Sequence, residues 1–176
     1  MTGMGGHHLP VFEKDEWLTP PGIIDALGGP AAFDLDPCAP ILRPWPMARE
    51  HLTLRENGLS CAWRGRLWFN PPYGGPSIVG PWMRRMAAHG QGTALIFART
   101  ETDLFFETVW KRASAILFLR GRLFFHHADG RRANNNAGAP SCLVAYGLDD
   151  ALRLERAKLD GRFIWLKPQG ELALGC

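Results

Sequence analysis

Four consecutive residues, Asn70-Pro71-Pro72-Tyr73, place two hydrogen-bond acceptors and an aromatic ring in one short turn. The turn follows the apolar segment 66–69, which predicts a strand, and two prolines cannot continue a β-ladder. Because proline fixes the backbone, we expect the Asn70 side-chain oxygen and the Pro71 carbonyl oxygen to be preorganised acceptors. The alternative interpretation is a rigid strand-ending turn without chemistry.

These four residues resemble the Asp/Asn/Ser-Pro-Pro-Tyr/Phe/Trp motif of the amino-methyltransferases that use S-adenosylmethionine. Further segments follow the order seen in the phage-type DNA N6-adenine methyltransferase (Dam-like) family. They are Trp17-Leu18-Thr19-Pro20, Phe33-Asp34-Leu35-Asp36-Pro37-Cys38-Ala39, Asn57-Gly58-Leu59, Trp63, Gly65, Ala98-Arg99-Thr100-Glu101-Thr102, Arg120-Gly121-Arg122-Leu123-Phe124 and Ala139-Pro140-Ser141. The resemblance covers about residues 15–147, and its specificity lies in the combination and order of the segments.

By this resemblance, the catalytic residues are Asn70, Pro71, Pro72 and Tyr73. The exocyclic amine of a nucleobase is a poor nucleophile, because its lone pair is delocalised into the ring. Acceptors on Asn70 and Pro71 would hold both amine hydrogens and draw the nitrogen toward tetrahedral geometry. Tyr73 would offer a ring on which a flipped base stacks.

The resemblance also implies S-adenosylmethionine as cofactor. Thr19-Pro20 corresponds to the element that closes over the methionine end, and Asp36-Pro37-Cys38-Ala39 to the first cofactor motif, with Asp36 pairing with the ammonium group. Two features depart from the family pattern. No glycine-rich loop follows the first strand, and no acidic residue that would hold the cofactor ribose is identified at the end of a second strand, Glu50 and Glu56 being weak candidates.

The net charge of +3 conceals a strong asymmetry along the chain. Residues 1–42 carry one base and six acids, a net charge of −5, whereas residues 43–132 carry fourteen bases and six acids, a net charge of +8. The acidic segment suits a cationic cofactor, and the basic segment suits a polyanion or is simply a solvated, arginine-rich surface. We expect DNA-backbone contacts from five arginines: Arg99, Arg120, Arg122, Arg131 and Arg132. The loop 126–140 contains Asn134-Asn135-Asn136. We expect it either to contact phosphates or base edges of DNA or to be a mobile surface loop without base contacts.

Apolar runs alternate with segments of helical spacing, which predicts an α/β fold. Strands are expected near residues 31–35, 66–69, 93–98, 115–119, 141–146 and 163–166, and helices over 19–29, 78–89 and 103–112, with a short helix between the last two strands. Thr19 is the expected N-cap of the first helix, and 41–61 is expected to be mostly loop. The family resemblance narrows this to a Rossmann-like methyltransferase fold, a mostly parallel sheet flanked by helices whose two late strands form an antiparallel edge.

We therefore expect one methyltransferase domain over residues 1–176, with residues 1–14 as a flexible tail. Its expected activity is transfer of a methyl group to the N6 amine of adenine in DNA. A cytosine-N4 methyltransferase and a non-catalytic DNA-binding protein that retains the fold remain alternatives. No metal site and no membrane segment are expected, a cytoplasmic location is the default, and the oligomeric state stays open.

Overall fold

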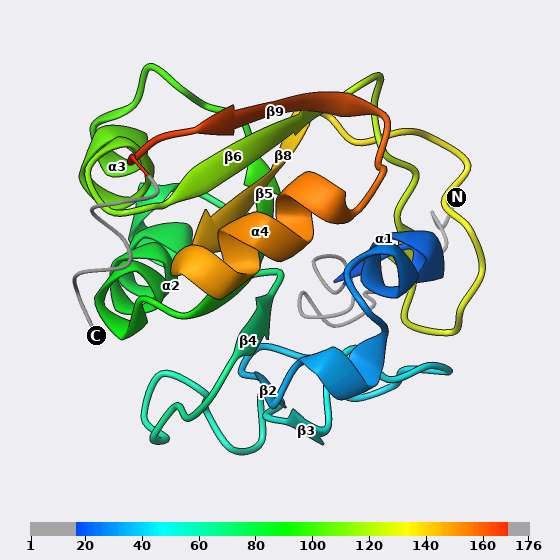
Figure 1. The fold of residues 1–176 in the computed structure, drawn as a ribbon. Helices are drawn as coiled ribbons and strands as arrows, with labels where there is room; N and C mark the ends of the chain where they lie inside the picture. The colour runs from blue at the N-terminus through cyan, green and yellow to red at the C-terminus, as the bar shows by residue number, and fades with distance from the viewer. Residues whose placement is uncertain (1–16, 169–176) are drawn as a thin grey trace, which may run out of the picture.

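The computed structural model describes residues 17–168 (Figure 1). The predicted tail at residues 1–14 lies outside this range. In chain order the elements are β1 (Trp17–Leu18), α1 (Pro21–Ala26), a 3-10 turn (Pro30–Ala32), β2 (Leu35–Asp36), β3 (Glu50–His51), β4 (Leu67–Phe69), α2 (Pro76–His89), β5 (Gly92–Phe97), α3 (Asp103–Phe105), a π-helical turn (Phe106–Trp110), β6 (Ala115–Leu119), β7 (His126–His127), β8 (Ser141–Tyr146), α4 (Leu148–Arg156) and β9 (Gly161–Trp165). The chain is thus α/β, as predicted.

Seven strands form one mixed sheet in the order β3-β2-β4-β5-β8-β6-β9. β3, β2, β4 and β5 pair in parallel, whereas β8 is antiparallel to both β5 and β6, and β9 is antiparallel to β6. Five strands therefore share one direction. The prediction that both late strands form an antiparallel edge is wrong for β8, which lies inside the sheet.

The interior position of β8 follows from its sequence and its connection. All six of its residues are buried, so both faces and both edges of the strand are covered. No helix separates β6 from β8, and a parallel return would need such a crossover. β9 contains exposed residues and is the true edge strand.

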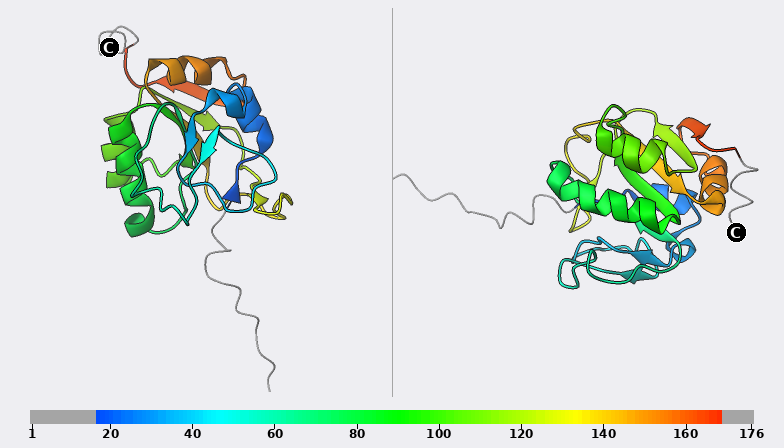
Figure 2. Two further views of the ribbon diagram at one scale, coloured as in Figure 1. Left: turned by 90° about the horizontal axis from the view of Figure 1, so that it is seen from below. Right: turned by 90° about the vertical axis from the view of Figure 1, so that its left-hand side faces the viewer.

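Helices cover both faces of the sheet, as the views in Figure 2 show: α2 and α3 lie on one side and α4 on the other. The side chains of β5 and β8 alternate between the two layers. Leu95 and Leu143 pack in the core that contains the buried residues of α1 and α4, whereas Ile96 and Val144 pack in the core that contains Met83 and Met86 of α2. This two-sided burial explains why both strands are almost continuously apolar.

Three local predictions near the N-terminus are corrected. α1 begins at Pro21 after Pro20, so Thr19 lies one residue before the N-cap and its side chain does not cap the helix. The strand expected over 31–35 is reduced to Leu35–Asp36, because Gly29 adopts a positive φ of 78° and Pro30 opens a 3-10 turn. β1 and β7 form a small antiparallel ribbon that pairs Trp17 with His127, which the sequence did not predict.

A buried ion pair ties α4 to the amino ends of the central strands. Arg66 Nε lies 2.6 Å from Asp150 Oδ1, and the two side chains are 8% and 1% exposed. Thr93 of β5 also donates to Asp150, Arg66 donates to the Ala32 carbonyl, and its guanidinium lies 4.1 Å from the centre of the Phe33 ring. This cluster is at the opposite end of β4 from the turn that begins at Asn70.

Candidate active site

Two hydrogen-bond partners, one an acceptor and the other a donor, hold the side chain of Asn70 in one orientation. Its Nδ2 donates to the Trp17 carbonyl oxygen at 2.9 Å, and its Oδ1 accepts from the Tyr73 hydroxyl at 2.9 Å. Because a carbonyl only accepts and this hydroxyl donates, the amide has a single favourable orientation. One lone pair of Oδ1 is left for a further donor.

Tyr73 is half-buried and packs its ring on Phe97, with ring centres 4.3 Å apart and planes 30° apart. Its hydroxyl also lies 3.3 Å from the Leu95 carbonyl oxygen. Burial raises the pKa of this phenol far above its ordinary value, so the hydroxyl stays protonated and keeps donating to Asn70.

Three cavities meet at Tyr73. The β2–β4 cavity, of about 340 Å³, lies between the turns that follow β2 and β4 and is lined by Trp17, Pro37, Cys38, Ala39, Pro40, Thr53, Leu54, Asn57, Gly58, Asn70, Pro71, Pro72, Tyr73 and Trp82. The α2–α3 cavity, of about 340 Å³, lies between those helices and the end of β5. The aromatic cavity, of about 250 Å³, lies between Trp17 of β1, Phe97, Phe125 and the segment 133–138.

Residues of both sequence motifs, the one after β2 and the one after β4, line the β2–β4 cavity. Pro37, Cys38 and Ala39 line it together with residues 70–73, and Cys38 Sγ donates to the Asn70 carbonyl oxygen at 3.2 Å. Thr19 and Pro20 do not line it; the Thr19 carbonyl instead accepts from the Trp45 indole.

Asp36 lies behind the cavity wall and does not line it. The residue is 2% exposed, and its Oδ1 accepts the Cys38 backbone N–H at 3.1 Å. Burial raises the pKa of the carboxyl from 3.8 to about 7, although the Cys38 hydrogen bonds and Arg43 oppose the shift. The Asp36 carboxyl therefore stabilises the turn after β2 by accepting the Cys38 backbone N–H.

This pKa predicts how stability depends on pH. A carboxyl whose pKa is raised by folding holds its proton more tightly in the native state, so its contribution to stability is full below about pH 4 and is lost as pH rises through 7. Asp36→Asn should raise the free energy of unfolding at pH 8.5 by on the order of 2–4 kcal/mol and change it little at pH 4. Urea unfolding at both pH values measures this, with Asp25→Asn on the exposed surface of α1 as control. Equal effects at the two pH values would contradict the assignment.

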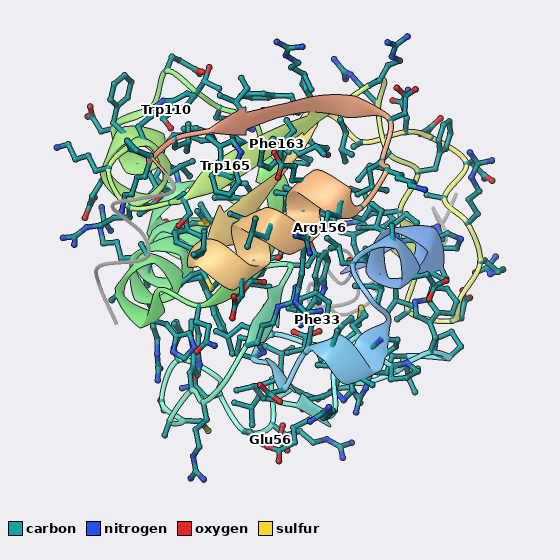
Figure 3. All side chains as sticks on the ribbon, in the orientation of Figure 1. Phe33, Glu56, Trp110, Arg156, Phe163 and Trp165 are labelled. Atoms are coloured by element: carbon teal, nitrogen blue, oxygen red, sulfur yellow. The ribbon has the colours of Figure 1, made fainter. Side chains whose placement is uncertain are left out.

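Glu50 and Glu56, the weak candidates for a ribose-binding acid, do not line the cavity. Glu50 borders a separate surface hollow, and Glu56 accepts from the Thr53 backbone and hydroxyl at 2.7 and 2.6 Å. Figure 3 shows Glu56 at the outer margin of the molecule. Among the residues described, the side chains that line this cavity are all uncharged.

Several residues of the β2–β4 cavity were missed by the sequence analysis, notably Thr53, Leu54 and Trp82. The segment Asn57-Gly58 was noted only as part of the family resemblance. Gly58 is required sterically, because a Cβ there would collide with the Pro37 carbonyl oxygen and touch Trp82. The loop after β3 can therefore approach the turn after β2 closely enough to form the cavity wall.

The five arginines predicted to contact DNA differ in their surroundings. Arg120 pairs with Asp160 at 3.1 Å and Arg131 with Asp129 at 2.7 Å. Arg122 donates to the carbonyl oxygens of residues 137 and 138. Arg132 lies 4.0 Å from the centre of the Phe124 ring, and Arg99 borders the α2–α3 cavity. Within residues 17–168, neither Arg99 nor Arg132 has a carboxylate at ion-pairing distance.

The DNA N-6-adenine-methyltransferase (Dam) family matches residues 6–157 of the chain. The match covers well over half of the sequence, so the chain belongs to this family. No curated protein and no solved structure matches it. Across residues 17–168, no helix is long and apolar enough to cross a membrane, and no three His, Cys, Asp or Glu side chains are grouped to hold a metal ion.

Proposed function

We propose that this protein transfers a methyl group from S-adenosylmethionine to the N6 amine of adenine in DNA. The observation that carries the proposal is the fixed amide of Asn70, whose Oδ1 faces away from Trp17 at the end of β4. A fixed acceptor costs no reorganisation when it binds a donor during reaction. Family membership supports the same activity.

In this proposal, Asn70 Oδ1 and the Pro71 carbonyl oxygen accept the two hydrogens of the target amine. The Tyr73 hydroxyl occupies one lone pair of Oδ1 and leaves the other for the amine. Cys38 stabilises the peptide between Asn70 and Pro71 by donating to the Asn70 carbonyl. These contacts hold the nucleophilic nitrogen at one place on the cavity wall.

The β2–β4 cavity is the proposed cofactor site. Its apolar surface, with Leu54 and Trp82, suits an adenine ring, and Thr53 and Asn57 offer neutral hydrogen-bonding groups for the ribose. When bound, S-adenosylmethionine supplies an electrophilic methyl group on a sulfonium. We assign the sheet to a Rossmann-like methyltransferase fold, because five strands share one direction and both motifs follow carboxyl ends of neighbouring strands.

The proposed DNA contacts lead to a prediction about individual arginines. Arg99→Ala combined with Arg132→Ala should reduce the magnitude of the negative slope of log affinity against log salt by about 2, because each phosphate contact contributes roughly 0.9. Arg120→Ala combined with Arg131→Ala should change it less, since both side chains already have carboxylate partners. Fluorescence anisotropy with a labelled duplex at several salt concentrations measures both slopes. A larger change in the salt slope for the Arg120/Arg131 double variant than for the Arg99/Arg132 double variant would contradict the choice of Arg99 and Arg132.

The activity is tested by incubating the protein with labelled S-adenosylmethionine and unmethylated DNA of mixed sequence, followed by nucleoside analysis. Labelled N6-methyladenine is the expected product. N4-methylcytosine in its place would assign the alternative base. Absence of any labelled nucleoside, together with absence of cofactor binding in calorimetry, would refute the enzyme proposal.

One observation favours a second candidate, a non-catalytic DNA-binding protein. The residues that line the β2–β4 cavity carry no charge, and Asp36 lies behind the wall, so no side chain visible there pairs with the cofactor's ammonium. Salt-sensitive DNA binding without calorimetric binding of S-adenosylmethionine would support this candidate.

A further inference from the structure

The aromatic cavity is built mainly from rings of four separate segments: Trp17, Tyr73, Phe97 and Phe125. The rings of Tyr73 and Phe125 meet edge to face with centres 5.8 Å apart, and those of Trp17 and Phe125 lie 6.5 Å apart. Trp17 and Tyr73 also line the β2–β4 cavity. The two cavities therefore share a wall beside Asn70.

The remaining wall is the segment 133–138, which is anchored at both ends. The Ala133 N–H donates to the Phe125 carbonyl at 2.8 Å, and the Ala137 N–H donates to the Leu123 carbonyl at 2.7 Å. Arg122 also donates to the carbonyl oxygens at the end of the segment. The backbone on either side of Asn134–Asn136 is therefore fixed.

Within this anchored segment, Asn135 and Asn136 line the aromatic cavity, whereas Asn134 does not. Ala133 and Ala137 are buried on either side, and the asparagines between them are exposed. Aromatic walls suit a planar ring, and a side-chain amide can donate to one ring edge and accept from it. Together they match a nucleobase that has left its helical stack.

We propose that the aromatic cavity receives the target base, and that Asn135 and Asn136 select adenine by hydrogen bonding to its ring edge. This inference rests on the proposed function, in which Asn70 and Pro71 hold the amine. Adenine then still presents unpaired ring nitrogens, to which an asparagine Nδ2 can donate. Cytosine has a single ring and reaches less far from its amine, so contacts at a distant edge favour the purine.

The double variant Asn135→Ala/Asn136→Ala tests the proposal, with Asn134→Ala as a matched control on the same segment. The double variant should lower kcat/KM for DNA by roughly 10- to 100-fold. It should also lower the ratio of N6-methyladenine to N4-methylcytosine in the product. The dissociation constant for S-adenosylmethionine and the free energy of unfolding should stay at wild-type values, which a merely structural role would not allow. Asn134→Ala, on a residue that does not line the cavity, should keep the wild-type product ratio, dissociation constant for S-adenosylmethionine and free energy of unfolding.

Binding to single-stranded oligo(dA) and oligo(dC) separates failure of this inference from failure of the proposed function. The wild type should prefer oligo(dA), and the double variant should lose that preference. If the wild type transfers no methyl group, but it prefers oligo(dA) and the double variant loses this preference, the proposed activity is refuted and the assignment of the aromatic cavity as the adenine site is supported. If the double variant matches Asn134→Ala in both binding preference and transfer, the inference is overturned whatever the activity.

Discussion

Asn70→Asp is expected to lower kcat for methyl transfer at least about 100-fold, the scale seen when one preorganised polar group is lost from an active site. The family motif accepts Asp at this position, but the surroundings in this chain favour the amide. The group that replaces Nδ2 faces the Trp17 carbonyl oxygen at 2.9 Å, so a carboxylate would place two acceptors against each other. An ionised carboxylate would rotate away from the Trp17 carbonyl oxygen, and the oxygen aimed at the amine would be lost.

The measurement is single-turnover transfer from labelled cofactor at saturating DNA, with circular dichroism as a check on folding. Asn134→Asp makes the same chemical change on an exposed residue outside the three cavities and should keep wild-type kcat. Retention of more than about a tenth of the wild-type rate by Asn70→Asp would show that the Trp17 contact does not orient the acceptor.

Asp150→Ala is expected to lower the free energy of unfolding by about 3–5 kcal/mol, because it leaves the Arg66 charge buried without its partner. Arg66 Nη2 already lacks a hydrogen bond within the described residues, and the Thr93 hydroxyl would lose its acceptor as well. For a chain of this size the melting temperature should fall by roughly 10 °C. Denaturant titration measures the change.

The double variant Arg66→Met/Asp150→Leu should recover most of that loss, because it removes both charges and keeps similar volume. Asp160→Ala, which breaks the exposed pair with Arg120, should cause no comparable change. If Asp150→Ala proves no more destabilising than Asp160→Ala, the buried pair does not contribute as described.

The long apolar strands and the turn at residues 70–73 could be predicted from the sequence. β6 is a continuous run of apolar residues, β5 and β8 are apolar apart from Thr93 and Ser141, and consecutive prolines mark the end of β4. β1, β2, β3 and β7 have two residues each, too few to leave a periodic pattern. Their pairing, such as Trp17 with His127, depends on contacts between distant segments.

The same limit applies to the candidate site. Pro37, Cys38 and Ala39 were assigned to the cofactor motif by the family resemblance, and the structure places them in the lining of the β2–β4 cavity. Asp36 was chosen for its charge, but alternation along a two-residue strand cannot show which way a carboxylate points, and this one is buried. Phe97, Phe125 and Asn135 come together only through the return of the chain between β6 and β8.

The interior position of β8 has a consequence for synthesis of the chain. Until residues 141–146 have left the ribosome, β5 and β6 each present an unpaired edge where β8 will later pair on both sides. Such edges template pairing with other chains, so an incomplete chain that ends before residue 141 should aggregate rather than persist as a smaller soluble domain. β8, which belongs to the last fifth of the sequence, thus completes the centre of the sheet.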